Sequence, residues 1–160
     1  MLQQKFTRRI GRIVLCAALG AAALSAVPAW AQFAKPENAV EYRQSALFLI
    51  GNHMGRIKAQ LDQSKPALDQ IKASAALIDV LKTVPFEAFT PGTADVGDSA
   101  AKPEIWKERD RFDKLAKEMQ DKVGQLNAAA QSGDVAAIRT AFGETGKACK
   151  NCHEDYRRKK

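Results

Sequence analysis

Four segments of this chain carry apolar residues at alternating steps of three and four, the spacing that places them on one face of a helix. The segments cover residues 36–62, 66–84, 103–131 and 135 to the C-terminus. No segment shows a comparable period-two alternation, and two of the three connections are short. The sequence therefore predicts an all-α fold, an antiparallel up-down-up-down four-helix bundle. The long connection, residues 85–102, is expected to be functional or mobile, because such loops are uncommon in compact domains.

The last predicted helix carries the motif with the most specific chemistry, since residues 149–153 read Cys-Lys-Asn-Cys-His. In this pattern two thiols bind the vinyl groups of a haem, and the adjacent imidazole ligates the iron. At about 100° per residue, Cys149, Cys152 and His153 fall within an arc of roughly 100° on one helical face. The motif predicts one covalently bound haem c with His153 as the axial iron ligand. The residues on the core face of this helix are Val135, Ile138, Phe142, Thr145, Cys149, Cys152 and Tyr156.

Two other uses of a Cys-x-x-Cys pair are weaker. A redox pair is expected near a strand-to-helix turn of a βαβ fold, and a zinc site needs further ligands. Apart from Cys16 near the N-terminus, the chain holds no other cysteine, and His53 is its only other histidine. The haem interpretation is therefore preferred.

The first 31 residues have the features of an export signal. Four basic residues precede an apolar run that begins at residue 13, and Ala29 and Ala31 supply small residues where a signal peptidase needs them. We expect cleavage after Ala31, which leaves residues 32–160 as one periplasmic domain with no membrane segment. An uncleaved anchor is the alternative, but the run is shorter than the ~20 apolar residues that a bilayer requires.

Cleavage would also change the charge and the cysteine count. The 25 basic residues fall by four to 21 against 18 acidic ones, a formal net charge of +3, which is too small to indicate a nucleic-acid partner. Cys16 would leave with the signal, so the two remaining cysteines lie in one short motif and cannot form a long-range disulfide. Stability must then come from a packed core.

The position of the motif near the C-terminus of an exported helical bundle resembles the cytochrome c prime family, also called class II cytochromes c. The resemblance covers the whole mature chain. Its supporting segments are residues 32–36 (Gln-Phe-Ala-Lys-Pro), 42–47 (Tyr-Arg-Gln-Ser-Ala-Leu), 102–106 (Lys-Pro-Glu-Ile-Trp) and 149–153, followed by Tyr156 and Arg157.

The family resemblance implies several roles. It implies that Arg43, Gln44 and Asp98 contact the haem, although the register of Asp98 depends on the length of the loop at residues 94–101. Arg157 is expected on the proximal side, near His153. Relatives pair through their first two helices, which together with outward-facing apolar residues such as Leu49 and Leu77 predicts an antiparallel homodimer.

The opposite side of the iron is predicted from the connectivity. The end of the fourth helix lies beside the start of the first. Leu47, on the apolar face (the seam) of the first predicted helix, should therefore face the haem at the height of His153. Met54 lies about 10 Å further along the first helix at 1.5 Å per residue, and Met119 is similarly displaced on the third. The iron is therefore expected to be five-coordinate, with an open apolar side suited to nitric oxide and carbon monoxide.

Arg43 interrupts the apolar seam four residues before Leu47. A core-facing guanidinium should bind an anion, and the haem propionates are the obvious buried acids. The alternative is snorkelling of the side chain to solvent at the helix end. Five aromatic residues are expected as core or haem wall, with plain core packing as the preferred role: Phe86, Phe89, Trp106, Phe112 and Tyr156.

These features favour a periplasmic binder of nitric oxide, acting as a trap or carrier. The alternative is an electron carrier working with redox partner proteins, although the site lacks the sixth ligand such carriers use. A peroxidase-like enzyme would need a distal acid-base group, and the seam offers none, so no enzymatic activity is expected.

Overall fold

The computed structural model describes residues 33–159 of the chain. The predicted signal segment at residues 1–31 and its cleavage site lie outside the described residues. The elements are α1 (Pro36–Leu61), α2 (Leu68–Leu81), the 3-10 helix η2 (Val84–Ala88), α3 (Glu104–Lys107), α4 (Arg109–Ser132) and α5 (Val135–Tyr156).

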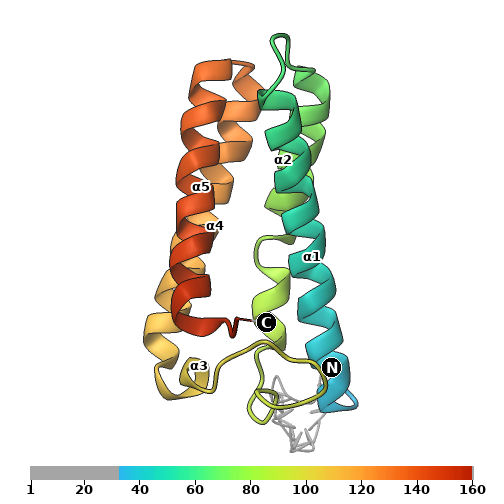
Figure 1. Ribbon diagram of the computed structural model, residues 1–160, viewed down its shortest axis with the longest axis vertical. Coiled ribbons are helices and arrows are strands. Elements are labelled where there is room, and N and C mark those ends of the chain that lie inside the picture. The colour runs from blue at the N-terminus through green and yellow to red at the C-terminus, as the bar shows by residue number, and fades with distance from the viewer. Residues whose placement is uncertain (1–32, 160) are drawn as a thin grey trace, which may run out of the picture.

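The four long helices form the predicted bundle. Helices α1 and α2 lie together on one side and α4 and α5 on the other, and the long loop crosses the end where α5 finishes (Figure 1). Residues 33–159 contain no strand, only one isolated antiparallel bridge between Ala101 and Arg157. The expected all-α fold with up-down-up-down connectivity is confirmed, and no helix in this part of the chain is long and apolar enough to span a membrane.

The helix starts follow the signals in the sequence. Pro36 lies in the first turn of α1, where its missing N–H costs no hydrogen bond. Gly133 ends α4 with φ of 77°, a left-handed conformation that favours glycine. The carboxylate of Asp134 then accepts the N–H groups of Ala136 and Ala137 at 2.8 and 3.2 Å, which caps α5.

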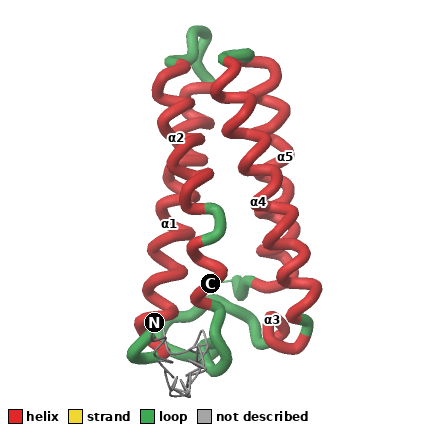
Figure 2. The backbone as a smooth tube through the Cα atoms, turned by 180° about the vertical axis from the view of Figure 1, so that it is seen from behind, coloured by secondary structure: helices red, strands yellow, loops and turns green. Residues whose placement is uncertain are grey.

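The third predicted helix is wrong in one respect, because residues 103–131 do not form one continuous helix. The backbone leaves the helical region at Glu108, with φ of −117° and ψ of 43°. Its carboxylate accepts a 2.9 Å hydrogen bond from the phenol of Tyr156. Short α3 therefore lies out of line with α4 at the end of the bundle (Figure 2). The second predicted helix also ends earlier than expected, and η2 follows with Pro85 in its first turn.

The core has two parts that meet end to end. The larger part joins the apolar seams of α1, α2, α4 and α5, with Ile57, Ile71 and Leu126 fully buried. Each such side chain stabilises the fold by roughly 1.5–3 kcal/mol relative to exposure. The smaller part lies near the long loop and is aromatic, with Phe112 in ring contact with Phe89 and Tyr156. This aromatic part is the one that borders the site described below.

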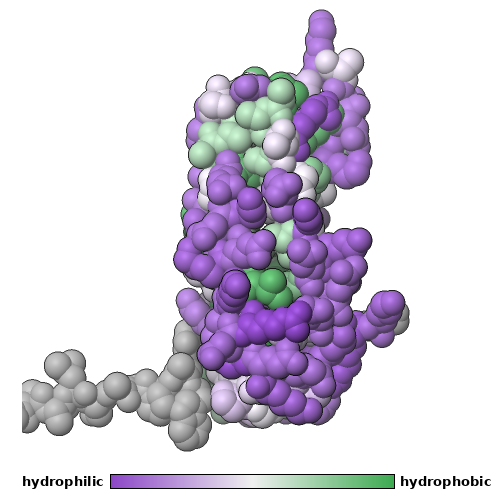
Figure 3. Space-filling view, turned by 90° about the vertical axis from the view of Figure 1, so that its left-hand side faces the viewer, coloured by the Kyte–Doolittle hydropathy of each residue, from purple (hydrophilic) through white to green (hydrophobic). Residues whose placement is uncertain are grey.

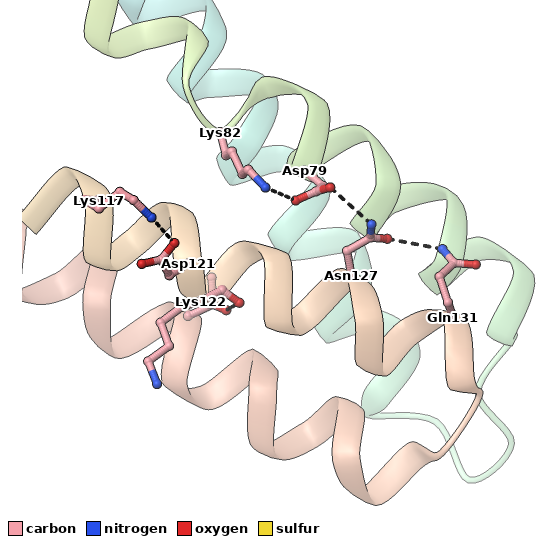
Figure 4. Close-up of polar contacts among 8 residues, drawn as sticks. Asp79, Lys82, Lys117, Asp121, Lys122, Asn127 and Gln131 are labelled. Carbon is pink, nitrogen blue, oxygen red and sulfur yellow. Dashed lines mark hydrogen bonds and ion pairs between the residues drawn. The ribbon is translucent and has the colours of Figure 1, made fainter.

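Polar contacts join α2 to α4 away from the aromatic end (Figure 4). The carboxylate of Asp79 accepts a 2.6 Å bond from Lys82, directly after α2, and a 3.3 Å bond from Asn127 on α4. Lys117 and Asp121 form an exposed pair along α4. Exposed pairs of this kind contribute at most about 1 kcal/mol each, so the apolar seams dominate the stability.

Candidate functional site

A cavity of about 620 Å³ lies at the aromatic end of the bundle and is lined from α1, η2, α4 and α5. Seven of the eight residues predicted for the site line it: Arg43, Gln44, Leu47, Cys149, Cys152, His153 and Arg157. The face of the molecule in Figure 3 is mostly hydrophilic, with apolar surface visible only in limited areas. The fold therefore brings residues from both ends of the sequence to one largely apolar cavity.

Helix α5 supplies the two thiols and the imidazole. Cys149 and Cys152 are partly buried and not joined in a disulfide, and both lie within the helix and not at a strand-to-helix turn. Burial raises the pKa of Cys149, and burial together with the charges of Cys149 and Asp155 raises the pKa of Cys152 to about 11. The raised pKa values of both groups favour neutral thiols over thiolates.

His153 follows directly and lines the same cavity. Burial, and then the charge of Arg157, lowers the pKa of the imidazole, which favours the neutral form that can ligate iron. The Nδ1 atom lies 3.5 Å from Nη1 of Arg157. Two thiols and an imidazole facing one apolar cavity are the donor set that a haem c requires, so the residues fit this group.

Helix α1 supplies the opposing wall. Leu47 is partly buried, lines the cavity and packs against the aromatic part of the core. Its isobutyl group brings no hydrogen-bond donor or acceptor to the site. Met54 and Met119 line the same cavity, and Met54 lies two helical turns beyond Leu47, about 10 Å along α1.

Arg43 is buried, with only 2% of its surface exposed, so the snorkelling alternative is wrong. Nη1 donates to the Ala88 carbonyl at 3.0 Å and to the Thr93 hydroxyl at 2.7 Å. Nη2 donates to the Thr93 carbonyl at 2.7 Å and to the Ser99 hydroxyl at 2.8 Å. The long loop thus supplies the polar partners of this guanidinium, and a contact with a haem propionate stays a prediction.

The guanidinium of Arg43 also lies over an aromatic ring, with Cζ 4.6 Å from the centroid of Phe89. Burial lowers the pKa of Arg43 to about 10, which leaves the side chain protonated at neutral pH. A protonated guanidinium held between a ring and loop oxygens fixes the loop on α1.

Asp98 is the one predicted site residue that does not line the cavity. It is exposed, and its carboxylate accepts a 3.2 Å hydrogen bond from Nε2 of Gln44, which does line the cavity. Asp98 therefore lies one contact away from the site, and its role in haem binding stays a prediction.

The aromatic residues divide between wall and support. Phe86, Phe89, Phe112 and Tyr156 line the cavity. Trp106 packs against the same cluster and donates from Nε1 to the Thr90 carbonyl at 3.0 Å. Four of the five thus combine core packing with a place in the cavity wall, so a prediction of plain core packing is incomplete for these four.

Sequence patterns missed the residues of the loop that hold the site together. Thr93 and Ser99 are buried and bind Arg43, yet they look like ordinary loop residues in the sequence. The only signal was indirect: a core-facing arginine needs acceptors, and a long loop can provide them.

Comparisons with known proteins identify relatives of this chain. The sequence profile of the family described as cytochrome c prime matches residues 38–157. Cytochrome c prime of Alcaligenes xylosoxydans is 45% identical over 130 residues, which is 81% of this chain and the whole of that protein.

Two solved structures are similar in fold as well as in sequence. One is a nitric oxide complex of a mutant of cytochrome c prime from Alcaligenes xylosoxidans, with a TM-score of 0.74, 43% identity and coverage of 80% of this chain and 99% of that one. The other is a cytochrome c prime with ligand-controlled dimer dissociation, with a TM-score of 0.74, 36% identity and coverage of 78% and 98%. This chain belongs to the cytochrome c prime family.

Proposed function

We propose that this protein is a periplasmic nitric oxide binder, a trap or carrier that also takes carbon monoxide. Its haem c, the covalent cofactor of the family, is attached through Cys149 and Cys152 and ligated by His153. When bound, the haem supplies an iron centre with one coordination position left for a small neutral ligand.

One observation carries this proposal: Leu47 and His153 line the same cavity from helices that run in opposite directions. An axial ligand from α5 then faces an aliphatic side chain from α1, which cannot serve as a sixth iron ligand. Met54, the nearest methionine of α1, lies about 10 Å further along. This arrangement favours five-coordinate iron.

The wall around Leu47 selects among diatomic ligands. The residues that line the cavity directly after Leu47 on α1 are Phe48, Ile50 and Gly51, none of which offers a side-chain hydrogen bond, while Arg43 and Gln44, one turn before it, donate to oxygens of the long loop. Bound dioxygen is polarised and gains from a hydrogen-bond donor, whereas nitric oxide and carbon monoxide need less such help. The nitric oxide complex of a relative at 43% identity supports the same ligand class.

The protein is also proposed to act as an antiparallel homodimer. Five large apolar side chains are exposed on α1 and α2, and Phe48 and Val80 are the most exposed, at 71% and 72%. Large exposed apolar side chains on two neighbouring helices are typical of an interaction face. A relative with ligand-controlled dimer dissociation supports pairing between two copies of this chain.

Absorption spectra of the reduced, purified protein before and after addition of one equivalent of nitric oxide test the proposal. We expect the spectrum of five-coordinate high-spin ferrous haem, converted at once to that of a nitrosyl complex. A low-spin six-coordinate spectrum that stoichiometric nitric oxide does not change would reject this function and favour the electron carrier.

A further inference from the structure

Lys102, at the end of the long loop, binds the end of the helix that carries His153. Its ammonium donates to the carbonyls of Glu154 and Asp155, at 3.0 Å each. These carbonyls belong to the last turn of α5, where backbone oxygens have no partner within the helix. A lysine placed there satisfies two of them and opposes the negative end of the helix dipole.

The backbone around Lys102 pairs with the residues that follow His153. The N–H of Lys102 donates to the Tyr156 carbonyl at 3.0 Å, and the N–H of Arg158 donates to the Ala100 carbonyl at 2.8 Å. Between these bonds, Ala101 and Arg157 form the isolated antiparallel bridge. Backbone hydrogen bonds on both sides of Arg157 therefore fix the direction in which the chain leaves α5.

Arg157 is the residue that this pairing places against the imidazole. Its N–H donates to the His153 carbonyl at 3.1 Å, and Nη1 lies 3.5 Å from Nδ1 of His153. A guanidinium has no acceptor for the N–H that this nitrogen carries when the other nitrogen ligates iron, so Arg157 acts on the orientation and basicity of the ligand through packing and charge. Lys102 itself does not line the cavity, so it acts on the iron through α5, through Arg157 and through its charge.

We propose that Lys102 is a positioning residue for the proximal side of the haem. It fixes the last turn of α5 and the backbone of Arg157, and thereby sets the bond between His153 and the iron. Its positive charge, held against the two residues that follow His153, also favours the reduced iron, because it opposes the additional positive charge of the oxidised state. This inference rests on the proposed ligation by His153.

The test compares Lys102→Met, which removes both the charge and the donors, with Lys102→Arg, which keeps both. Lys107→Met is the matched control, since Lys107 is 70% exposed and has only a 3.8 Å pair with Glu104. The readouts on the haem-loaded proteins are the reduction potential and the iron–histidine stretching band in resonance Raman spectra of the unliganded ferrous state. We expect a lower potential and a shifted band in Lys102→Met alone, with wild-type values in Lys102→Arg and Lys107→Met.

A second variant keeps the test decisive if Lys102→Met does not accumulate. Lys102→Gln retains hydrogen-bond donors but not the charge. It should therefore lower the reduction potential, and it should shift the iron–histidine band less than Lys102→Met does. Unchanged potential and band in both variants, even with reduced thermal stability, would show that Lys102 only supports the fold. A wild-type protein without an iron–histidine band would instead reject the proposed ligation itself, which separates the two failures.

Discussion

Nη2 of Arg43 donates a 2.8 Å hydrogen bond to the hydroxyl of Ser99, 56 residues further along the chain. The same hydroxyl accepts the backbone N–H of Ala101 at 3.2 Å. Ala101 forms the bridge to Arg157. One serine thus joins the helix that carries Leu47 to the segment that follows His153, so the two walls of the cavity are held at a fixed separation by the loop.

Replacing Arg43 with methionine should destabilise the protein by about 2–4 kcal/mol, because buried loop acceptors lose their donors. Arg43→Lys should recover only part of this loss, since an ammonium cannot reproduce four hydrogen bonds in a planar fork. Denaturant unfolding measures the difference, with the exposed Arg56→Met on the same helix as control. An equal, small loss in Arg43→Met and Arg56→Met would contradict the structural role of this guanidinium.

Tyr156 predicts how stability depends on alkaline pH. Burial, and then the hydrogen bond and charge of Glu108, raises the pKa of the phenol to about 12 from its ordinary 10.0. The folded state therefore holds this proton more tightly than the unfolded state, and the stability gained is complete below pH 10. Unfolding free energy should fall as pH rises from about 10 to about 12.

Unfolding of Tyr156→Phe across the same pH range provides the control. The variant loses the bond to Glu108 and should be less stable at neutral pH by about 0.5–1.5 kcal/mol. The fall in its unfolding free energy between pH 10 and 12 should also be smaller than in the wild type. A decline as steep as in the wild type would mean that other groups cause it.

The fold and the meeting of the α5 residues with Leu47 in one cavity could be predicted from the sequence, because both depend on local periodicity. Steps of three and four placed Cys149 and Cys152 on the core face of α5, and antiparallel connectivity placed Leu47 in the same cavity as His153. These inferences need only helix geometry and chain order. No contact between side chains distant in sequence had to be known.

The loop could not be predicted in the same way. The bonds from Arg43 to Thr93 and Ser99 span 50 and 56 residues and join side chains that follow no periodic pattern. The break at Glu108 was missed for a related reason, since the apolar seam continues through it and its partner, Tyr156, is 48 residues away. Tertiary hydrogen bonds decided both features.

Covalent attachment predicts a simple chemical outcome. In Cys149→Ala with Cys152→Ala, the pigment should be extracted by acid acetone, or no haem-loaded protein should form, because no thioether holds the porphyrin. The wild type should retain its haem under the same treatment. Pigment that resists extraction from the double variant would reject these two thiols as the attachment points.

The exposed apolar face of α1 and α2 predicts a dimer that charge can disrupt. Phe48→Lys and Val80→Lys should each weaken association at least tenfold, because like charges would meet across a symmetric interface. Light scattering at micromolar concentration measures the mass, and Lys117→Glu on α4 is a control outside this face. A wild-type protein that is monomeric under these conditions would contradict the proposed pairing.

Leu47 provides the most direct test of the account, since its side chain should lie over the open face of the iron and obstruct ligands. Leu47→Ala should speed carbon monoxide association with the reduced protein by about tenfold or more, equivalent to about 1.4 kcal/mol of barrier. The partly buried site should lose about 1–3 kcal/mol of stability, less than a fully buried leucine. Leu49→Ala is the matched control, because Leu49 is on the same helix but does not line the cavity.

Stopped-flow mixing of each reduced protein with carbon monoxide gives the association rate constants. The account predicts faster binding in Leu47→Ala alone, with Leu49→Ala at the wild-type rate. A folded Leu47→Ala protein that binds carbon monoxide no faster than the wild type would contradict the assignment of α1 to the open side of the iron.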